Sequence, residues 1–148
     1  MNPAMRELAE RLVSSEIKDS GSRQSEIEAS FSVCEKLRQE LVVLTGVAGF
    51  CALLSRTLAL LHKEDVQRLG ITRIRMDGSL EKVDHSGIPD TLEAPAQDPV
   101  ILPAQLLDLL SVFIGEPMTV QIVEKVWPEL DVSELRQSNA DQTEGAHL

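Results

Sequence analysis

The amino-acid sequence predicts a mainly α-helical fold: a small helical bundle with one β-hairpin at about residues 71–83 and a C-terminal helical hairpin. Three observations predict it. Apolar residues recur at steps of three and four over long stretches, which is the spacing of amphipathic helices. Aromatic residues make up only 3% of the 148 residues, so the core must be aliphatic. One strong turn signal, Asp77-Gly78, interrupts the helical pattern and is typical of a hairpin.

The first predicted helix covers about residues 3–18. Asn2 can cap its N-terminus, and Pro3 suits the first helical position, where the missing N–H costs nothing. A narrow apolar stripe then follows at Met5, Leu8, Leu12 and Ile17. The polar run at residues 19–22 predicts the break after this helix.

The second predicted helix covers about residues 25–44 and is the clearest amphipathic helix in the chain. Ser25 and Glu28 have the spacing of a capping box, which predicts its start. Its apolar stripe consists of Ile27, Phe31, Cys34, Leu37, Leu41 and Leu44. At Thr45-Gly46 three alternatives stay open: the helix ends there, bends there, or continues into the next one.

The third predicted helix, at about residues 47–64, lacks a polar face. The stretch from Leu41 to Leu61 contains only one full charge, Arg56, and has the length of about 20 apolar residues that crosses a bilayer. The same pattern is typical of the central helix of a soluble bundle, covered on all sides. We expect a core helix, because the preceding amphipathic helix needs a cover for its stripe. A single membrane span through residues 41–61 is the alternative.

A β-hairpin is predicted from the sequence ITRIRMDGSLEKV at residues 71–83. A two-residue turn at Asp77-Gly78 would place Arg73 opposite Lys82, which is unfavourable. A three-residue loop of Asp77, Gly78 and Ser79 instead places Met76 opposite Leu80 and Arg75 opposite Glu81. We therefore expect the three-residue loop, with Ile74, Met76 and Leu80 on one face.

The chain divides into four predicted segments. Residues 1–83 form the helical core and the hairpin, and residues 84–99 form a linker rich in Pro and Asp. Residues 100–130 form a pair of helices, the first ending at Gly115-Glu116-Pro117 and the second following Thr119 and ending before Pro128. Residues 131–148 form an acidic tail that we expect to be disordered.

The charge of the chain disfavours nucleic acid as a partner. Its net charge is −10, from 24 acidic and 14 basic residues, and such a surface repels phosphate backbones. The N-terminal residues mix charges without an apolar run, so we expect no secretory signal and a cytoplasmic protein, or an inner-membrane protein if residues 41–61 span. Cys34 and Cys51 belong to no CxxC pair and are expected to be buried free thiols.

No set of residues commits the chain to catalysis. His62, Glu64 and Asp65 are the best metal cluster, but neighbouring residues on a helix point in different directions. The run at residues 84–86 holds the residue types of a nucleophilic triad, yet three consecutive residues cannot converge into a relay. We therefore predict no enzyme activity, no catalytic residue, no metal site and no cofactor.

The C-terminal pair has a local pattern of its own, carried by Leu106-Leu107, Leu110, the run from Gly115 to Thr119, Ile122-Val123 and Val126-Trp127. This pattern, at residues 106–127, resembles the first two helices of the winged-helix effector domain of bacterial response regulators. The resemblance implies a transcription regulator. That family contacts DNA chiefly through a third, basic helix and a β-wing, whereas this chain continues into an acidic segment.

The sequence therefore favours a non-catalytic protein–protein interaction module, or a subunit of a bacterial-type cytoplasmic assembly, whose partner is another protein or a second copy of the chain. No small molecule is implied. Arg73 and Arg75 share one face of the hairpin, where they can hold an anionic group or form a solvated side paired with Glu81. Together with Phe113 and Trp127 they are the candidate interaction residues. The regulator and the single-span membrane protein are the alternatives.

Overall fold

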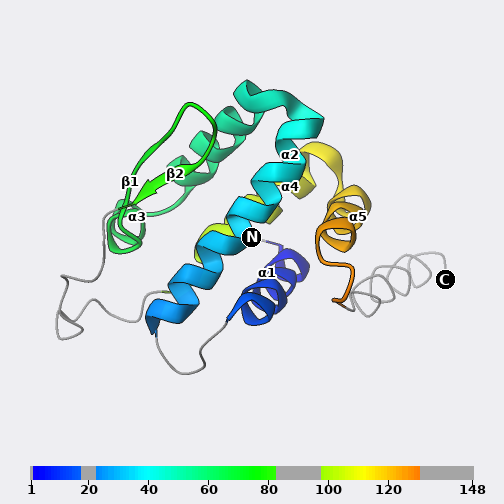
Figure 1. The fold of residues 1–148 in the computed structure, drawn as a ribbon, viewed down its shortest axis with the longest axis horizontal. Helices are drawn as coiled ribbons and strands as arrows, with labels where there is room; N and C mark the ends of the chain where they lie inside the picture. The colour runs from blue at the N-terminus through cyan, green and yellow to red at the C-terminus, as the bar shows by residue number, and fades with distance from the viewer. Residues whose placement is uncertain (1, 18–22, 83–97, 131–148) are drawn as a thin grey trace.

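The computed structural model describes residues 2–17, 23–82 and 98–130, and in these ranges the chain forms helices and one two-stranded sheet. The predicted helical bundle with one β-hairpin is confirmed. The elements, in chain order, are α1 (Pro3–Glu16), α2 (Arg23–Leu60), α3 (Lys63–Arg68), β1 (Ile71–Ile74), β2 (Leu80–Lys82), α4 (Ile101–Ile114) and α5 (Glu116–Val126) (Figure 1).

The core lies between α1, α2 and α4, which all contact one another. Their apolar stripes meet there, and the aliphatic side chains that the sequence predicted fill the space. The largest fully buried side chains include Leu8, Leu12, Leu37, Leu41, Leu102, Leu106, Leu107 and Leu110. Burial of one such leucine contributes roughly 1.5–3 kcal/mol to folding relative to an exposed one. This aliphatic core fixes the positions of α2 and α4, which carry the surfaces described below.

Helix α2 bends at Gly46, where φ is 78° and ψ is 163°. That backbone conformation is essentially restricted to glycine, and it turns the chain so that α2 has two arms, residues 23–45 and residues 47–60. Figure 1 shows the second arm folding back from the bend toward the hairpin. Of the three alternatives left open at Thr45-Gly46, the structure has the bend. The predicted helices at 25–44 and 47–64 correspond to the two arms.

The predicted start of the helix is confirmed for α1 and wrong for α2. The Asn2 side chain accepts a hydrogen bond of 2.9 Å from the Ala4 amide, and Pro3 is the first helical residue. Helix α2 already begins at Arg23, so Ser25 lies inside the first turn and the predicted cap at Ser25 is wrong. Beyond the second arm, His62 has extended backbone angles, and a separate short helix, α3, follows that the sequence did not predict.

The hairpin is confirmed, and its predicted register is wrong. Ile74 pairs with Leu80 and Arg73 with Glu81, so the loop runs over residues 75–79 instead of three residues. Two interactions explain the longer loop. The Asp77 side chain accepts hydrogen bonds from both the amide and the hydroxyl of Ser79, and the Arg75 amide donates to the Ser79 carbonyl at 2.8 Å. Met76 therefore lies at the exposed tip rather than on the strand face.

Helices α4 and α5 form the predicted C-terminal pair. Gly115, with φ of 89°, ends α4 and also precedes the first residue of α5. Helix α5 begins at Glu116, so the prediction that it follows Thr119 is wrong. The Thr119 hydroxyl donates to the Gly115 carbonyl inside the first turn and is fully buried. The predicted linker at 84–99 falls outside the described residues except for its last two positions, and the predicted disordered tail at 131–148 falls outside them entirely.

Candidate functional site

Large apolar side chains are exposed on both sides of the bend in α2. We call this group the bend surface, and it consists of Val43, Leu44 and Val47. Val43 exposes 79% of its surface although it lies between buried Leu41 and buried Phe50 in the sequence. The reason is geometric. The bend carries these residues beyond the end of the bundle, where no described element covers them.

A second apolar group lies at the turn from α4 to α5. We call it the turn surface, and it consists of Val112, Phe113, Ile114 and Met118. Val112 exposes 74% and Phe113 67% of its surface. The remainder of α4 is buried or half-buried, and full exposure begins at Val112. Isolated exposed apolar residues are ordinary, whereas these four exposed side chains come from one turn of the chain.

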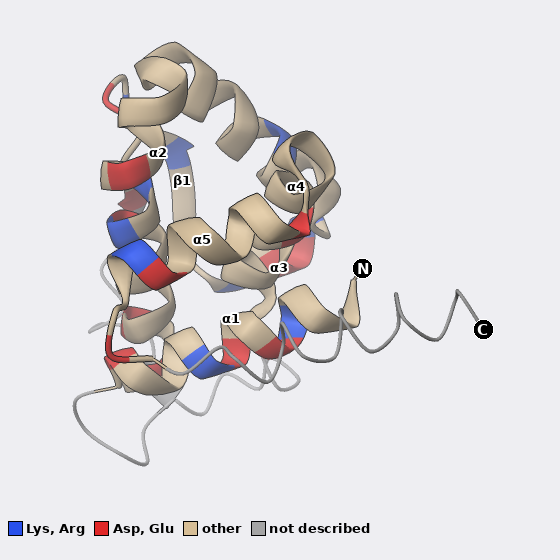
Figure 2. Cartoon of the chain, turned by 90° about the vertical axis from the view of Figure 1, so that its right-hand side faces the viewer, with Lys and Arg blue, Asp and Glu red and all other residues tan. Residues whose placement is uncertain are grey.

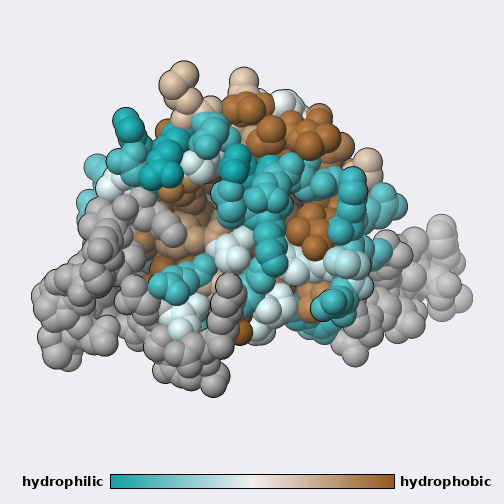
Figure 3. Space-filling view, in the orientation of Figure 1, coloured by the Kyte–Doolittle hydropathy of each residue, from teal (hydrophilic) through white to brown (hydrophobic). Residues whose placement is uncertain are grey.

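Both surfaces lie toward the same end of the molecule and carry no charge of their own. The sequence has no Asp, Glu, Lys or Arg from Leu41 to Ser55 or from Leu109 to Gly115. In Figure 2 the bend at the top of the view is uncharged, whereas charged residues follow α1, the first arm of α2 and α5. Figure 3 shows hydrophobic residues gathered along the top of the molecule, over the bend.

The structure separates the four predicted interaction residues. Arg73 lies on β1 and pairs with the Glu81 carboxylate at 2.7 Å, while the Arg75 Nε lies 3.8 Å from the same carboxylate oxygen. Phe113 belongs to the turn surface. Trp127 is only 7% exposed, and the Lys36 ammonium lies 5.9 Å from the centre of its ring. The four residues therefore do not form one surface, and Trp127 is a core residue.

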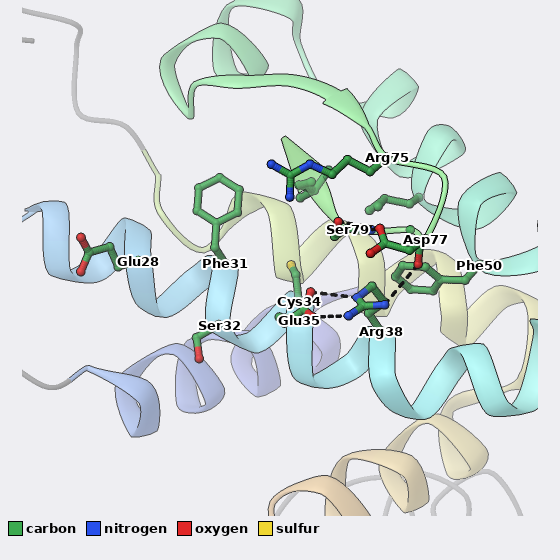
Figure 4. Close-up of a pocket in the computed structure, with 13 residues that line it drawn as sticks. Glu28, Phe31, Ser32, Cys34, Glu35, Arg38, Phe50, Arg75, Asp77 and Ser79 are labelled. Carbon is green, nitrogen blue, oxygen red and sulfur yellow. Dashed lines mark hydrogen bonds and ion pairs between the residues drawn. The ribbon is translucent and has the colours of Figure 1, made fainter. Parts of the chain in front are cut away.

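A cavity of about 530 Å³ lies between the first arm of α2, the second arm and the hairpin loop. Its floor is apolar and its rim carries charges of both signs (Figure 4). The lining residues are Glu28, Phe31, Ser32, Cys34, Glu35, Arg38, Phe50, Leu54, Arg75, Asp77, Gly78, Ser79 and Leu80. We call this space the hairpin cavity. Only Arg75 among the predicted interaction residues lines it.

Arg38 ties the hairpin loop to α2. Its guanidinium donates to the Glu35 carboxylate through both Nε, at 2.9 Å, and Nη2, and to the Asp77 carbonyl at 3.2 Å. The hydrogen bonds to Glu35 raise the pKa of Arg38 above its ordinary value. Gly78 lies so close to the Phe50 ring that a Cβ there would be 2.8 Å from Cδ2. The loop is thus anchored to α2 by one hydrogen bond, from Arg38 to the Asp77 carbonyl, and by the tight contact of Gly78 with Phe50.

The Asp77 carboxylate has its own local partners. The Ser79 hydroxyl donates at 2.6 Å and the Ser79 amide at 2.9 Å. These hydrogen bonds, the side-chain bond first, lower the pKa of Asp77 below its ordinary value of 3.8. The ionised carboxylate therefore accepts two hydrogen bonds within the loop.

Within residues 2–17, 23–82 and 98–130, no three His, Cys, Asp or Glu side chains are placed to hold a metal ion. Cys34 is a buried free thiol. Cys51 is also free but only partly buried, which corrects the prediction that both are buried, and its Sγ lies 3.9 Å from the carbonyl oxygens of Arg75 and Met76.

One helix of the described chain, α2, is long and apolar enough over Ser25–Leu60 to cross a membrane, judged by length and composition alone. Only 28% of its most apolar window is buried inside the bundle. The core helices of soluble proteins and signal sequences also pass this test. The bend at Gly46 interrupts the apolar stretch at residues 41–61, so no straight helix covers it in this structure.

Comparisons of the chain with protein-family models, with curated proteins and with solved structures find no match.

Sequence reasoning missed the bend surface and most of the hairpin cavity. The uncharged run at residues 41–55 was the available signal for the first, because such a run must either be covered or present an apolar surface. The second had no local signal, since Phe31, Phe50 and Asp77 lie far apart in the sequence and meet only because α2 folds back under the hairpin.

Proposed function

We propose that this protein is a non-catalytic interaction module that binds a second copy of itself through the bend surface and the turn surface. The observation that carries the proposal is the exposure of seven large apolar side chains, while the core of the same small bundle is well filled. Such groups are typical of association sites, because removing them from water on contact is favourable.

The charge distribution supports a second copy as the partner. The chain carries a net charge of −10, so two copies repel each other over most of their surfaces. All residues of the two surfaces except Met118 lie in the uncharged runs Leu41–Ser55 and Leu109–Gly115. Contact there brings apolar side chains together without bringing carboxylates together. A basic partner would instead favour the carboxylates of α1, a helix on which no large apolar side chain is exposed.

The backbone at the bend also suits close contact between helices. Four small residues are exposed there, namely Gly46, Ala48, Gly49 and Ala52. Small residues let two helices approach closely and pack with few gaps. Two bends related by a twofold axis would each place their valines and leucines against the small residues of the other, which is the isologous geometry of most homodimers.

The experiment is a measurement of mass in solution by size-exclusion chromatography with light scattering, across a range of concentrations. We expect the wild type to form a dimer or larger oligomer. Leu44→Glu and Phe113→Glu each bury a carboxylate in the proposed contact and are expected to weaken association at least about tenfold. Met76→Glu is the matched control, because Met76 is 95% exposed at the hairpin tip and outside both surfaces.

A monomeric wild type at high concentration would overturn the proposal. So would equal weakening by all three variants, since that would reflect added negative charge and not a defined surface. Circular dichroism of each variant checks that the bundle is folded, and the exposed positions make unfolding an unexpected result.

A membrane span is the second candidate function, favoured by the length and composition of α2. A membrane span would require α2 to change its shape. The second arm, residues 47–60, is roughly 21 Å long at 1.5 Å per residue, short of the hydrocarbon thickness of about 30 Å. Spanning therefore requires Gly46 to become helical. Fractionation without detergent distinguishes the candidates: a protein that stays in the pellet through alkaline washes is membrane-bound, and a defined soluble oligomer is not.

A further inference from the structure

We propose that the hairpin cavity binds a small amphipathic carboxylate, with the carboxylate at Arg75 and the apolar body against the aromatic floor. This site is separate from the proposed association surfaces, because none of their seven residues lines the cavity. The inference therefore does not rest on the proposed function. It goes beyond the sequence-based expectation, which implied no small molecule.

The floor of the cavity suits an apolar body. Phe31 and Phe50 come from the two arms of α2, and Leu54 lies one turn beyond Phe50. All three are buried, so their positions are fixed by the core. A volume of about 530 Å³ lies within the range of pockets that hold small organic ligands. Phe31 keeps more exposed surface, 8%, than Phe50 or Leu54, at 1% each, so an apolar chain placed here contacts chiefly the Phe31 ring.

One guanidinium at the rim, that of Arg75, lacks a close carboxylate partner among the described residues: its Nε lies 3.8 Å from Glu81. Arg38 is occupied by Glu35 and by the Asp77 carbonyl. Arg75 shares the single Glu81 carboxylate with Arg73, which holds it at 2.7 Å while Arg75 stays at 3.8 Å. Figure 4 shows the Arg75 side chain extending from the hairpin over the cavity, on the same side as the Phe31 ring. A ligand carboxylate can therefore pair with Arg75 in the place that Glu81 fills poorly.

The remaining charges restrict the ligand to one negative charge. Glu28, Glu35 and Asp77 also line the cavity, and the Asp77 carboxylate already accepts two hydrogen bonds from Ser79. A second negative charge on the ligand would meet these carboxylates without a cationic partner, so phosphates and dicarboxylates are disfavoured. A monocarboxylate with an apolar chain satisfies both the floor and the rim.

The test uses decanoate as the probe and nuclear magnetic resonance of the labelled full chain as the readout. Decanoate is expected to shift the amide signals of Gly78 and Ser79 in a saturable way. Decanol, which lacks the charge, and decylammonium, which reverses it, are expected to bind more weakly. Signals from the bend surface and the turn surface serve as internal controls for nonspecific adsorption to exposed apolar residues.

Three variants assign the carboxylate contact. Arg75→Ala is expected to weaken decanoate binding roughly fivefold, the effect of losing an ion pair at a half-exposed site. Glu81→Gln removes the competing carboxylate and is expected to tighten binding. Arg56→Ala removes an exposed arginine of the second arm that does not line the cavity, and is expected to leave binding unchanged.

Any of three results overturns the inference: shifts confined to Leu44 or Phe113, equal binding of decylammonium and decanoate, or an Arg75→Ala variant that binds like wild type. Arg75→Lys keeps the charge and separates loss of the ion pair from loss of the loop conformation, because it should retain most of the binding.

Discussion

The two arms of α2 belong to one helix by sequence continuity, yet they are buried to opposite degrees. The first arm is amphipathic, and its stripe of Ile27, Phe31, Cys34, Leu37 and Leu41 is buried against α1 and α4. The second arm is more apolar, but it buries only Phe50, Leu53, Leu54 and Thr57 within the helix. Leu60, at its end, exposes 47% of its surface.

This difference teaches that periodicity and partners, not the number of apolar residues, decide burial. The first arm faces two helices with matching stripes. The second arm lies beside the hairpin, whose loop is held to α2 by the Arg38 hydrogen bond to Asp77 and by the contact of Gly78 with Phe50. An apolar segment without a covering element therefore remains a surface, and in this chain it becomes the proposed contact.

The largest expected effect is on the free energy of unfolding, and it compares a buried residue of the first arm with an exposed residue at the bend. Leu37→Ala, in the first arm, is expected to lower the free energy of unfolding by about 3 kcal/mol, because Leu37 is fully buried and a cavity would remain. The matched change Leu44→Ala, two positions further along the same apolar stripe, is expected to alter it by less than about 0.5 kcal/mol in the monomer, because Leu44 is 56% exposed. Urea denaturation measures both. Equal effects of the two changes would show that Leu37 and Leu44 are not buried to different degrees.

The next effect tests the bend itself. Gly46→Ala is expected to lower the free energy of unfolding by about 1–3 kcal/mol, since a side chain there disfavours the observed backbone angles. A Cβ at this position would meet nothing within 4 Å, so the cost comes from the backbone alone. Thermal unfolding gives the stability. Small-angle scattering distinguishes a strained bend from a straightened α2, and an unchanged stability with unchanged shape would show that the bend does not need glycine.

The smallest effect concerns the loop that covers the second arm. Because the pKa of Asp77 is lowered in the folded state, its ionised form contributes stability that is present above the ordinary pKa of 3.8 and is lost as the pH falls through the lowered pKa. Ser79→Ala removes the largest cause of the shift, the hydroxyl hydrogen bond. We expect the pKa of Asp77 to rise toward its ordinary value, as measured by carboxyl resonance titration. An unchanged pKa in this variant would exclude the Ser79 hydroxyl as the cause.

The sequence by itself determined the elements and most of the core. The cap at Asn2, the stripe of the first arm from Ile27 to Leu41 and the Gly115 break are local patterns that the structure contains, because capping, periodicity and turn chemistry depend on neighbours in the chain. The last predicted residue of the stripe, Leu44, is exposed. Local patterns were less reliable at Ser25 and Thr119, where a helix already continued through a residue that is well suited to cap one.

Only the tertiary structure decided which apolar residues are covered and which distant residues meet. The hairpin register followed from the Asp77–Ser79 bonds and from the contact of Gly78 with Phe50, neither of which the strand pattern contains. The hairpin cavity exists because Gly46 turns the second arm back under the loop. Exposure of the bend surface has the same origin, since burial depends on what lies opposite a side chain, and sequence spacing specifies only the face on which it lies.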